Sequence, residues 1–183
     1  MNRSDACDLL HEFTHSDSLR KHAYAVEAAM RAYARQFGED EEEWGIVGLL
    51  HDFDYETYPS AEEHPFVGNR ILAERGWPEH IRRAIMSHAD YTGVARTSRM
   101  EHTLFAVDEL CGFILAVAYV RPEKKIAGLE ARSVRKKMKD KGFARAVSRD
   151  DLLAGAAGLG VELDAHIQFV IDALVTVSDS LGV

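Results

Sequence analysis

Apolar residues recur along this chain at the spacing of helices rather than of strands. In residues 19–37, for example, Ala23, Val26 and Met30 form one stripe of a helix that would end at Gly38. No segment shows the sustained alternation of β-branched and polar residues that is typical of a half-buried strand. The hydrophobic pattern therefore predicts an all-α protein.

Capping residues and helix breakers set the bounds of the predicted helices. Asp40 and Ser148 can each cap the first turn of a helix, whereas Gly76 and Pro122 are typical of positions where a helix has ended. The helices predicted in this way cover about residues 19–37, 41–51, 65–75, 78–88, 99–120, 149–159 and 163–181. Because no linker, repeat or low-complexity tract separates them, we expect residues 1–183 to form one domain.

Composition places the chain among soluble globular proteins, with 46% hydrophobic and 28% charged residues. The longest apolar run, residues 106–120, is interrupted by Asp108 and Glu109, and the first residues lack the apolar stretch of a signal peptide. Cys7 and Cys111 make no disulfide framework, and Cys111 is interpreted as a small buried residue of a helix. We therefore expect a cytoplasmic protein without a membrane-spanning helix.

The charge of the chain limits the kinds of partner it can have. A net charge of −8 argues against broad binding to nucleic acid, which requires a cationic surface. Within this acidic chain, residues 124–145 are locally basic, with cations at Lys124, Lys125, Arg132, Arg135, Lys136, Lys137, Lys139, Lys141 and Arg145. Two interpretations stay open for this stretch: a solvated helix face, or a subsite for an anionic substrate.

Charged residues inside apolar helices indicate the chemistry. The pair His51-Asp52 ends an apolar helix, and Asp108 lies inside another, where desolvated charge is costly unless a partner satisfies it. His22 lies one turn before Val26 on the first long helix and can face the same interior. Two imidazoles and two carboxylates would suit Fe, Mn, Co, Ni, Zn or Mg. The chain contains no H-E-x-x-H, Walker or G-x-S-x-G motif that would offer another catalytic centre.

The order His, His-Asp, Asp resembles the HD superfamily of metal-dependent phosphohydrolases. The surrounding motifs are also similar: Gly48-Leu49-Leu50-His51-Asp52, His64-Pro65-x-x-Gly68, Ile85-x-x-His88 and Ala106-Val107-Asp108. The resemblance covers about residues 19–120 and implies a helical bundle in which His22, His51, Asp52 and Asp108 hold a metal. Residues 123–183 would form a helical extension, similar to that of a bacterial branch of predicted HD hydrolases. The dyad is followed by Phe53-Asp54 rather than Ile-Gly, and the Gly-Tyr-Pro signature of cyclic dinucleotide phosphodiesterases is absent.

The resemblance also bears on metal count and reaction. In two-metal members, histidines between the dyad and the last aspartate bind a second ion, and His64 and His88 match those positions. The alternative is that His64 begins a helix and His88 is a satisfied histidine at a helix end, so one or two divalent ions are expected. The implied activity is hydrolysis of a nucleotide or another small phosphorylated metabolite by metal-activated water. Asp52 would orient that water and accept its proton.

Four further residues are candidates for contact with the substrate. Arg121 and Lys137 are predicted to bind its phosphate, although each could be a surface cation. Asp90 and Tyr91 follow one of the middle histidines and are candidates for the lining of the pocket.

Several charged residues near the site are assigned no role in it. Asp54 and Glu56, just after the dyad, are interpreted as loop carboxylates in solvent, with orientation of water as the alternative. Glu109 is expected to face elsewhere, because adjacent helix residues point about 100° apart. His166 has no partner that the sequence identifies and is interpreted as a surface or capping residue.

Two other functions are kept beside hydrolysis. A sensor module would bind a nucleotide through the same metal site without turning it over. A di-iron oxygenase would use two irons and consume oxygen. If the protein were purely structural, Asp108 in its apolar helix would need a buried basic partner to balance its charge.

Overall fold

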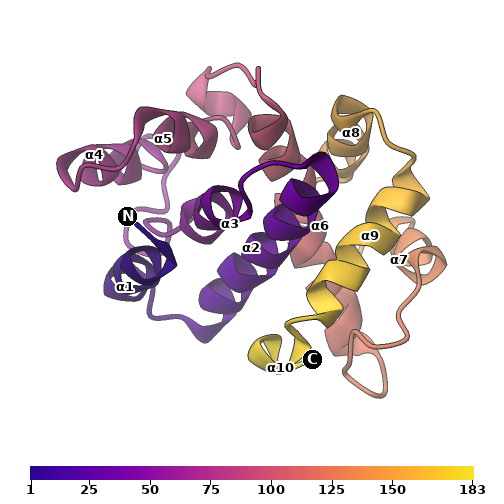
Figure 1. Cartoon of the computed structure of the whole chain (residues 1–183). Helices are drawn as coiled ribbons and strands as arrows, with labels where there is room; N and C mark the ends of the chain where they lie inside the picture. Colours follow the sequence, from indigo (N-terminus) through magenta and orange to yellow (C-terminus); the bar gives the residue numbers. More distant parts are fainter.

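The two longest helices, α2 (Asp17–Phe37) and α6 (Arg99–Val120), pack against each other at the centre of the protein. The computed structural model describes residues 1–183, and its regular elements are all helical (Figure 1). The others are α1 (Arg3–Phe13), α3 (Glu41–Leu50), α4 (Phe66–Glu74), α5 (Glu79–Met86), η1 (Asp90–Thr92), α7 (Ala131–Met138), α8 (Arg149–Leu159), α9 (Leu163–Val175) and α10 (Ser178–Leu181). The predicted all-α fold class is confirmed.

The remaining helices flank the central pair on two sides (Figure 1). Helix α3 packs along α2, and α4 and α5 lie beyond it, whereas α8 and α9 pack against α6 and α7 packs against α9. One continuous hydrophobic core extends from Ala6 on α1 to Val183 at the C-terminus. The segment after residue 120 therefore buries its apolar side chains in the same core as the preceding helices.

Local sequence explains many of the helix ends. Asp40 and Ser148 accept hydrogen bonds from backbone N–H groups in the first turns of α3 and α8, as predicted. Gly38 follows α2 with a φ of 72°, a left-handed conformation that glycine adopts without a steric penalty. Helices α6 and α8 have the predicted bounds, and α2, α3, α4 and α5 differ from prediction by one or two residues at their ends.

Two parts of the helix prediction were wrong. The segment predicted as one helix over residues 163–181 forms α9 and α10, because its β-branched run at Val175, Thr176 and Val177 is a poor helix former. Helix α1 was missed, although Asn2 and Asp5 form a reciprocal capping box at its start. In the basic stretch, α7 buries two apolar side chains and keeps most of its cations at the surface, which supports the interpretation as a solvated helix face.

Helix α6 is long and apolar enough to cross a membrane by length and composition alone. However, 61% of its most apolar window is buried inside the fold, and residues such as Cys111 and Ile114 are fully buried. Helix α6 is therefore a core helix of this bundle. The interpretation of Cys111 as a small buried residue is confirmed, and neither Cys111 nor Cys7 forms a disulfide.

A buried polar bridge fastens α9 to both central helices. The hydroxyl of Tyr33 on α2 donates to Nδ1 of His166 at 2.6 Å, and Nε2 of His166 donates to the carbonyl oxygen of Ala106 on α6 at 3.1 Å. The interpretation of His166 as a surface or capping residue was wrong. Its partners lie far away in the sequence, so no local pattern could indicate them.

Candidate metal centre

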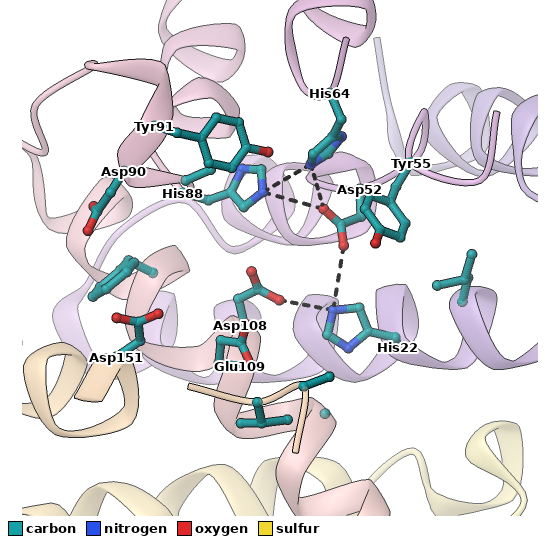
Figure 2. A pocket seen from close by; sticks show the side chains of 16 residues that line it. His22, Asp52, Tyr55, His64, His88, Asp90, Tyr91, Asp108, Glu109 and Asp151 are labelled. Atoms are coloured by element: carbon teal, nitrogen blue, oxygen red, sulfur yellow. Dashed lines mark hydrogen bonds and ion pairs between the residues drawn. The ribbon is translucent and has the colours of Figure 1, made fainter. Parts of the chain in front are cut away.

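Four side chains converge beside the α2–α6 pair and form what we call the first ligand group; Figure 2 shows three of them, those of His22, Asp52 and Asp108. His22 comes from α2 and Asp108 from α6, while His51 and Asp52 follow the last turn of α3. The Nε2 atoms of His22 and His51 are 3.2 Å apart and lie 2.9 Å and 3.2 Å, respectively, from Oδ1 of Asp108. One ligand atom from each of the four residues lies within 4.8 Å of the others, a spacing that one metal ion can span.

A second ligand group, made of Asp52, His64 and His88, adjoins the first and shares Asp52 with it (Figure 2). Oδ1 of Asp52 lies 3.1 Å from Nε2 of His64 and 3.4 Å from Nε2 of His88. The other oxygen, Oδ2, lies 3.4 Å from Nε2 of His51 and 4.0 Å from Nε2 of His22. Each carboxylate oxygen of Asp52 therefore faces one group, and the side chain could contribute a ligand atom to either group.

Backbone carbonyl groups fix the tautomer of two of these histidines. Nδ1 of His51 lies 2.8 Å from the carbonyl oxygen of Gly48, and Nδ1 of His88 lies 2.6 Å from that of Ile85. A carbonyl oxygen can only accept a hydrogen bond, so each Nδ1 carries the hydrogen. In the neutral rings, the lone pair of Nε2 then points into the ligand group, as metal binding requires.

The donor set fits a divalent metal. The Nε2 atoms of His22 and His51 face each other at 3.2 Å, and those of His64 and His88 face each other at 3.3 Å. Lone pairs at these distances repel unless a proton or a cation lies between them. Imidazole nitrogens together with carboxylate oxygens suit Fe, Mn, Co, Ni or Zn, and one ion in each group would satisfy all of them.

Without a metal ion, protons would balance the charge of the carboxylates. Burial lowers the pKa of His51, but Asp52 and Asp108 outweigh it and raise that pKa well above its usual value. Burial also lowers the pKa of His64, while hydrogen bonds to Asp52 and Asp54 raise it to about 9. Burial would raise the pKa of Asp52, yet the neighbouring His51 holds it well below its usual range. Protonated imidazoles would therefore exchange their protons for a metal.

A cavity of about 540 Å³ opens onto both ligand groups (Figure 2). Beyond the ligands, its lining consists of Leu19, Tyr55, Ala89, Asp90, Tyr91, Phe105, Glu109, Gly112, Ala146, Val147 and Asp151. The prediction that Asp90 and Tyr91 line the pocket is confirmed. Tyr55 and Asp151 were not predicted, because their placement depends on how distant segments pack and no motif spacing indicates it. The lining contains no lysine or arginine.

Glu109 lies in this lining, so the expectation that it faces elsewhere was wrong. Although Glu109 and Asp108 point in different directions from α6, the cavity is wide enough for both to reach it. Burial raises the pKa of Glu109, and the negative charges of Asp108 and Asp151 raise it further, to about 7. The wall next to the first ligand group is therefore acidic.

The expectation for the two carboxylates after the dyad was wrong for Asp54 and correct for Glu56. Asp54 is buried, and its oxygens accept hydrogen bonds from Nδ1 of His64 and from the backbone N–H of Gly68, both at 2.8 Å. Glu56 is exposed and accepts from the backbone N–H of Ser16, which fastens the turn after the dyad to the chain before α2. The buried Phe53 beside Asp54 was the available signal that this turn folds inward.

Neither cation that was predicted to bind substrate lines the cavity. The guanidinium group of Arg121 donates to the carbonyl oxygens of Lys125 and Ala127 and thereby closes the loop after α6. Nζ of Lys137 lies 4.9 Å from the ring centroid of Phe143, a cation–π contact. Both side chains therefore have partners within the fold. The basic stretch that carries Lys137 packs along the C-terminal half of the chain and not over the ligand groups.

The fold and the site together define a class of protein, namely an all-α bundle whose helices bring histidines and aspartates together in groups suited to a divalent metal. A family model described as HD domain matches residues 19–174, and the chain belongs to this family. HD domains are generally metal-dependent hydrolases. The match reaches into α9 and so includes much of the segment after residue 120. No curated protein and no solved structure gave a significant match.

Proposed function

We propose that this protein is a two-metal phosphohydrolase that acts on a nucleotide or another small phosphorylated metabolite. The observation that carries the proposal is the sharing of Asp52 between two ligand groups at the floor of a cavity. His22, His51 and Asp108 would hold one ion with Asp52, and His64 and His88 would hold the other. A divalent ion bound there would polarise the P–O bond and lower the pKa of water.

Residues of the chain itself would position the attacking water and the substrate. Asp52 would accept a hydrogen bond from the attacking water and so orient it, because its ionised carboxylate lies between both ligand groups. Tyr55 and Tyr91 are 41% and 53% exposed and offer aromatic faces in the cavity lining to the organic part of the substrate. The volume of the cavity suits a small metabolite. The net charge of −8 also favours a small molecule over nucleic acid as the partner.

The charge of the lining narrows the substrate class. Asp90, Glu109 and Asp151 line the cavity, and no lysine or arginine does. A phosphoryl group must therefore be bound through the metal ions, while further phosphates would meet carboxylates. This favours substrates with one phosphoryl group over polyphosphates. We also expect the protein to act in the cytoplasm, consistent with two cysteines that are both free.

Hydrolysis of phosphate esters by the metal-loaded protein tests the proposal. The protein would be loaded with Mn²⁺, Fe²⁺, Co²⁺ or Zn²⁺ and offered nucleoside monophosphates, sugar phosphates and small phosphodiesters. We expect either phosphate release from at least one monoester or cleavage of a phosphodiester to its monoester, followed by chromatography, and loss of both bound metal and turnover in Asp52→Ala. The matched control is Asp150→Asn on α8, because Asp150 is exposed and lies outside the cavity lining.

A protein that retains its metal yet hydrolyses none of these compounds would contradict hydrolysis and favour the sensor module. An oxygenase is the second candidate, because four imidazoles with one shared carboxylate also suit a pair of irons. Oxygen consumption by the iron-loaded protein, with no turnover when manganese replaces iron, would favour it.

A further inference from the structure

The carboxylate of Asp54 lies directly behind one histidine of the second ligand group. Nδ1 of His64 lies 2.8 Å from Oδ1 of Asp54, whereas the Nδ1 atoms of His51 and His88 face neutral backbone carbonyls. The side chains of Asp54 and His64 are only 1% and 4% exposed. Water therefore screens this charged hydrogen bond little.

A second contact holds the same carboxylate in place. Oδ2 of Asp54 accepts from the backbone N–H of Gly68 at 2.8 Å, in the first turn of α4, where N–H groups have no acceptor within the helix. Pro65, which precedes this turn, supplies no side-chain cap. A Cβ atom at residue 68 would lie 2.7 Å from Cγ of Asp54, so this approach requires glycine. Held by one partner at each oxygen, the carboxylate cannot rotate away from His64.

We propose that Asp54 is a positioning residue that enables His64 to bind a second metal ion. The inference rests on the proposed two-metal centre. An ionised carboxylate can only accept hydrogen bonds, so Asp54 keeps the hydrogen on Nδ1 of His64 and leaves Nε2 free for a metal. Its negative charge also makes Nε2 a stronger ligand. Because no carboxylate stands behind His51 in this way, Asp54 should affect the second ion and spare the first.

The substitution Asp54→Asn removes the charge of Asp54 and one of its two hydrogen-bond acceptors while it keeps the size of the side chain nearly unchanged. An amide of nearly the same size has one oxygen and one NH₂ group in place of two acceptors. If the oxygen accepts from Gly68, the NH₂ group donates to Nδ1 of His64, the ring hydrogen moves to Nε2, and metal binding is blocked. If the amide is reversed, the NH₂ group faces the N–H of Gly68, and two buried donors meet without an acceptor.

Metal titration of the whole protein with Mn²⁺ or Zn²⁺, followed by elemental analysis, tests the proposal without measuring activity. We expect about two ions per wild-type chain, and an affinity for the second ion weakened about 10- to 100-fold in Asp54→Asn with the first unchanged. His64→Ala should likewise retain one ion. Glu56→Gln, an exposed carboxylate of the same turn, is the matched control and should retain both.

The outcomes separate this inference from the proposed function. Two ions bound by Asp54→Asn with wild-type affinity would overturn the role of Asp54 and leave the two-metal centre standing. One ion in the wild-type protein would overturn the two-metal centre and the role of Asp54 with it.

A measurement on the wild-type protein does not depend on how the variant folds. In zinc-loaded protein with ¹⁵N-labelled histidines, long-range ¹H–¹⁵N spectra would show which nitrogen of His64 carries hydrogen. We expect hydrogen on Nδ1 that exchanges slowly with water, and zinc on Nε2. Zinc on Nδ1, or an Nδ1 hydrogen in rapid exchange, would overturn the proposal.

Discussion

The backbone of Gly48 on α3 lies so close to α2 that a Cβ atom at residue 48 would be 2.9 Å from the carbonyl oxygen of Val26. His22 lies one helical turn before Val26, and the His51-Asp52 pair lies one turn after Gly48. The close contact of the two backbones therefore sets the distance between the elements that supply three of the four residues of the first ligand group.

Replacing Gly48 by alanine should separate α2 from α3. Because the added methyl group would meet backbone, which cannot rotate aside, we expect Gly48→Ala to lower the free energy of unfolding by about 1–3 kcal/mol. We also expect weaker binding of the first metal ion. Urea unfolding of the metal-free protein and metal titration measure the two effects.

The control for this variant is Gly158→Ala on α8, because the nearest atom to its new Cβ, Nδ1 of His102, would be at an ordinary 3.5 Å. Alanine there should stabilise the protein by up to about 1 kcal/mol through its higher helix propensity. If Gly48→Ala is as stable as wild type and binds metal equally well, the contact does not set the spacing of the site.

The buried His166 should make stability depend on pH. Burial lowers the pKa of His166 below its usual 6.5, so the unfolded chain binds this proton more tightly than the folded protein does. The stabilisation associated with neutral His166 is therefore fully present above about pH 6.5 and decreases as the pH falls below it. His166→Gln, which cannot titrate, should lose less free energy of unfolding than wild type between pH 7.5 and pH 5.5.

Denaturant unfolding of both metal-free proteins at the two pH values checks this prediction. The metal-ligand histidines titrate in both proteins, so their contribution cancels in the comparison. The same pH dependence in wild type and His166→Gln would show that folding does not lower the pKa of His166.

Metal binding should release protons. Without metal, burial lowers the pKa of His64 but hydrogen bonds to Asp52 and Asp54 raise it to about 9, so this ring carries an extra proton at pH 7, and the raised pKa of His51 acts in the same direction. Loading both ligand groups at pH 7 should therefore release at least about one proton per chain, and affinity should rise with pH up to about 9. Calorimetric titration in two buffers of different ionisation enthalpy counts the protons.

The variant His64→Gln provides the comparison for that count. It lacks the ring whose pKa is about 9 and should release about one proton fewer than wild type. Metal binding without proton release in wild type would mean that the imidazoles are already neutral, and the charges described for the centre would be incorrect.

The core of the candidate site could be predicted because its residues break a local pattern. Asp108 is an aspartate within an apolar helix, and His51-Asp52 ends another, so each stands out against the residues on either side of it. Asp54 and His166 could not be predicted in this way. His166 is satisfied by partners on distant segments, and Asp54 by His64 and the backbone of Gly68 across the following turn. Neither set of contacts follows from a local pattern of residues.

Glu109 was expected to face away from the site for the same reason, namely that the sequence does not show how segments pack. Helical geometry correctly gives Glu109 a different direction from Asp108, but it does not give the width of the cavity. The arrangement of α8 beside α6 brings Asp151 to the same wall, and this arrangement depends on close packing of Gly155 against Ala106. Helix bounds were predictable from caps, whereas the contacts between helices were not.

The acidic wall formed by Glu109 and Asp151 should determine which phosphorylated compounds are accepted. The carboxylates would repel a second phosphate beyond the one bound through the metal ions. If the protein is a phosphohydrolase, Glu109→Gln with Asp151→Asn should therefore raise kcat/KM for a nucleoside diphosphate about three- to tenfold relative to the corresponding monophosphate. The effect should shrink as ionic strength rises, because both side chains are partly exposed. Asp150→Asn removes a neighbouring charge outside the cavity lining and should leave the ratio unchanged. An unchanged ratio in the double variant, with metal content intact, would show that the substrate does not extend along this wall and that its selectivity arises elsewhere in the cavity.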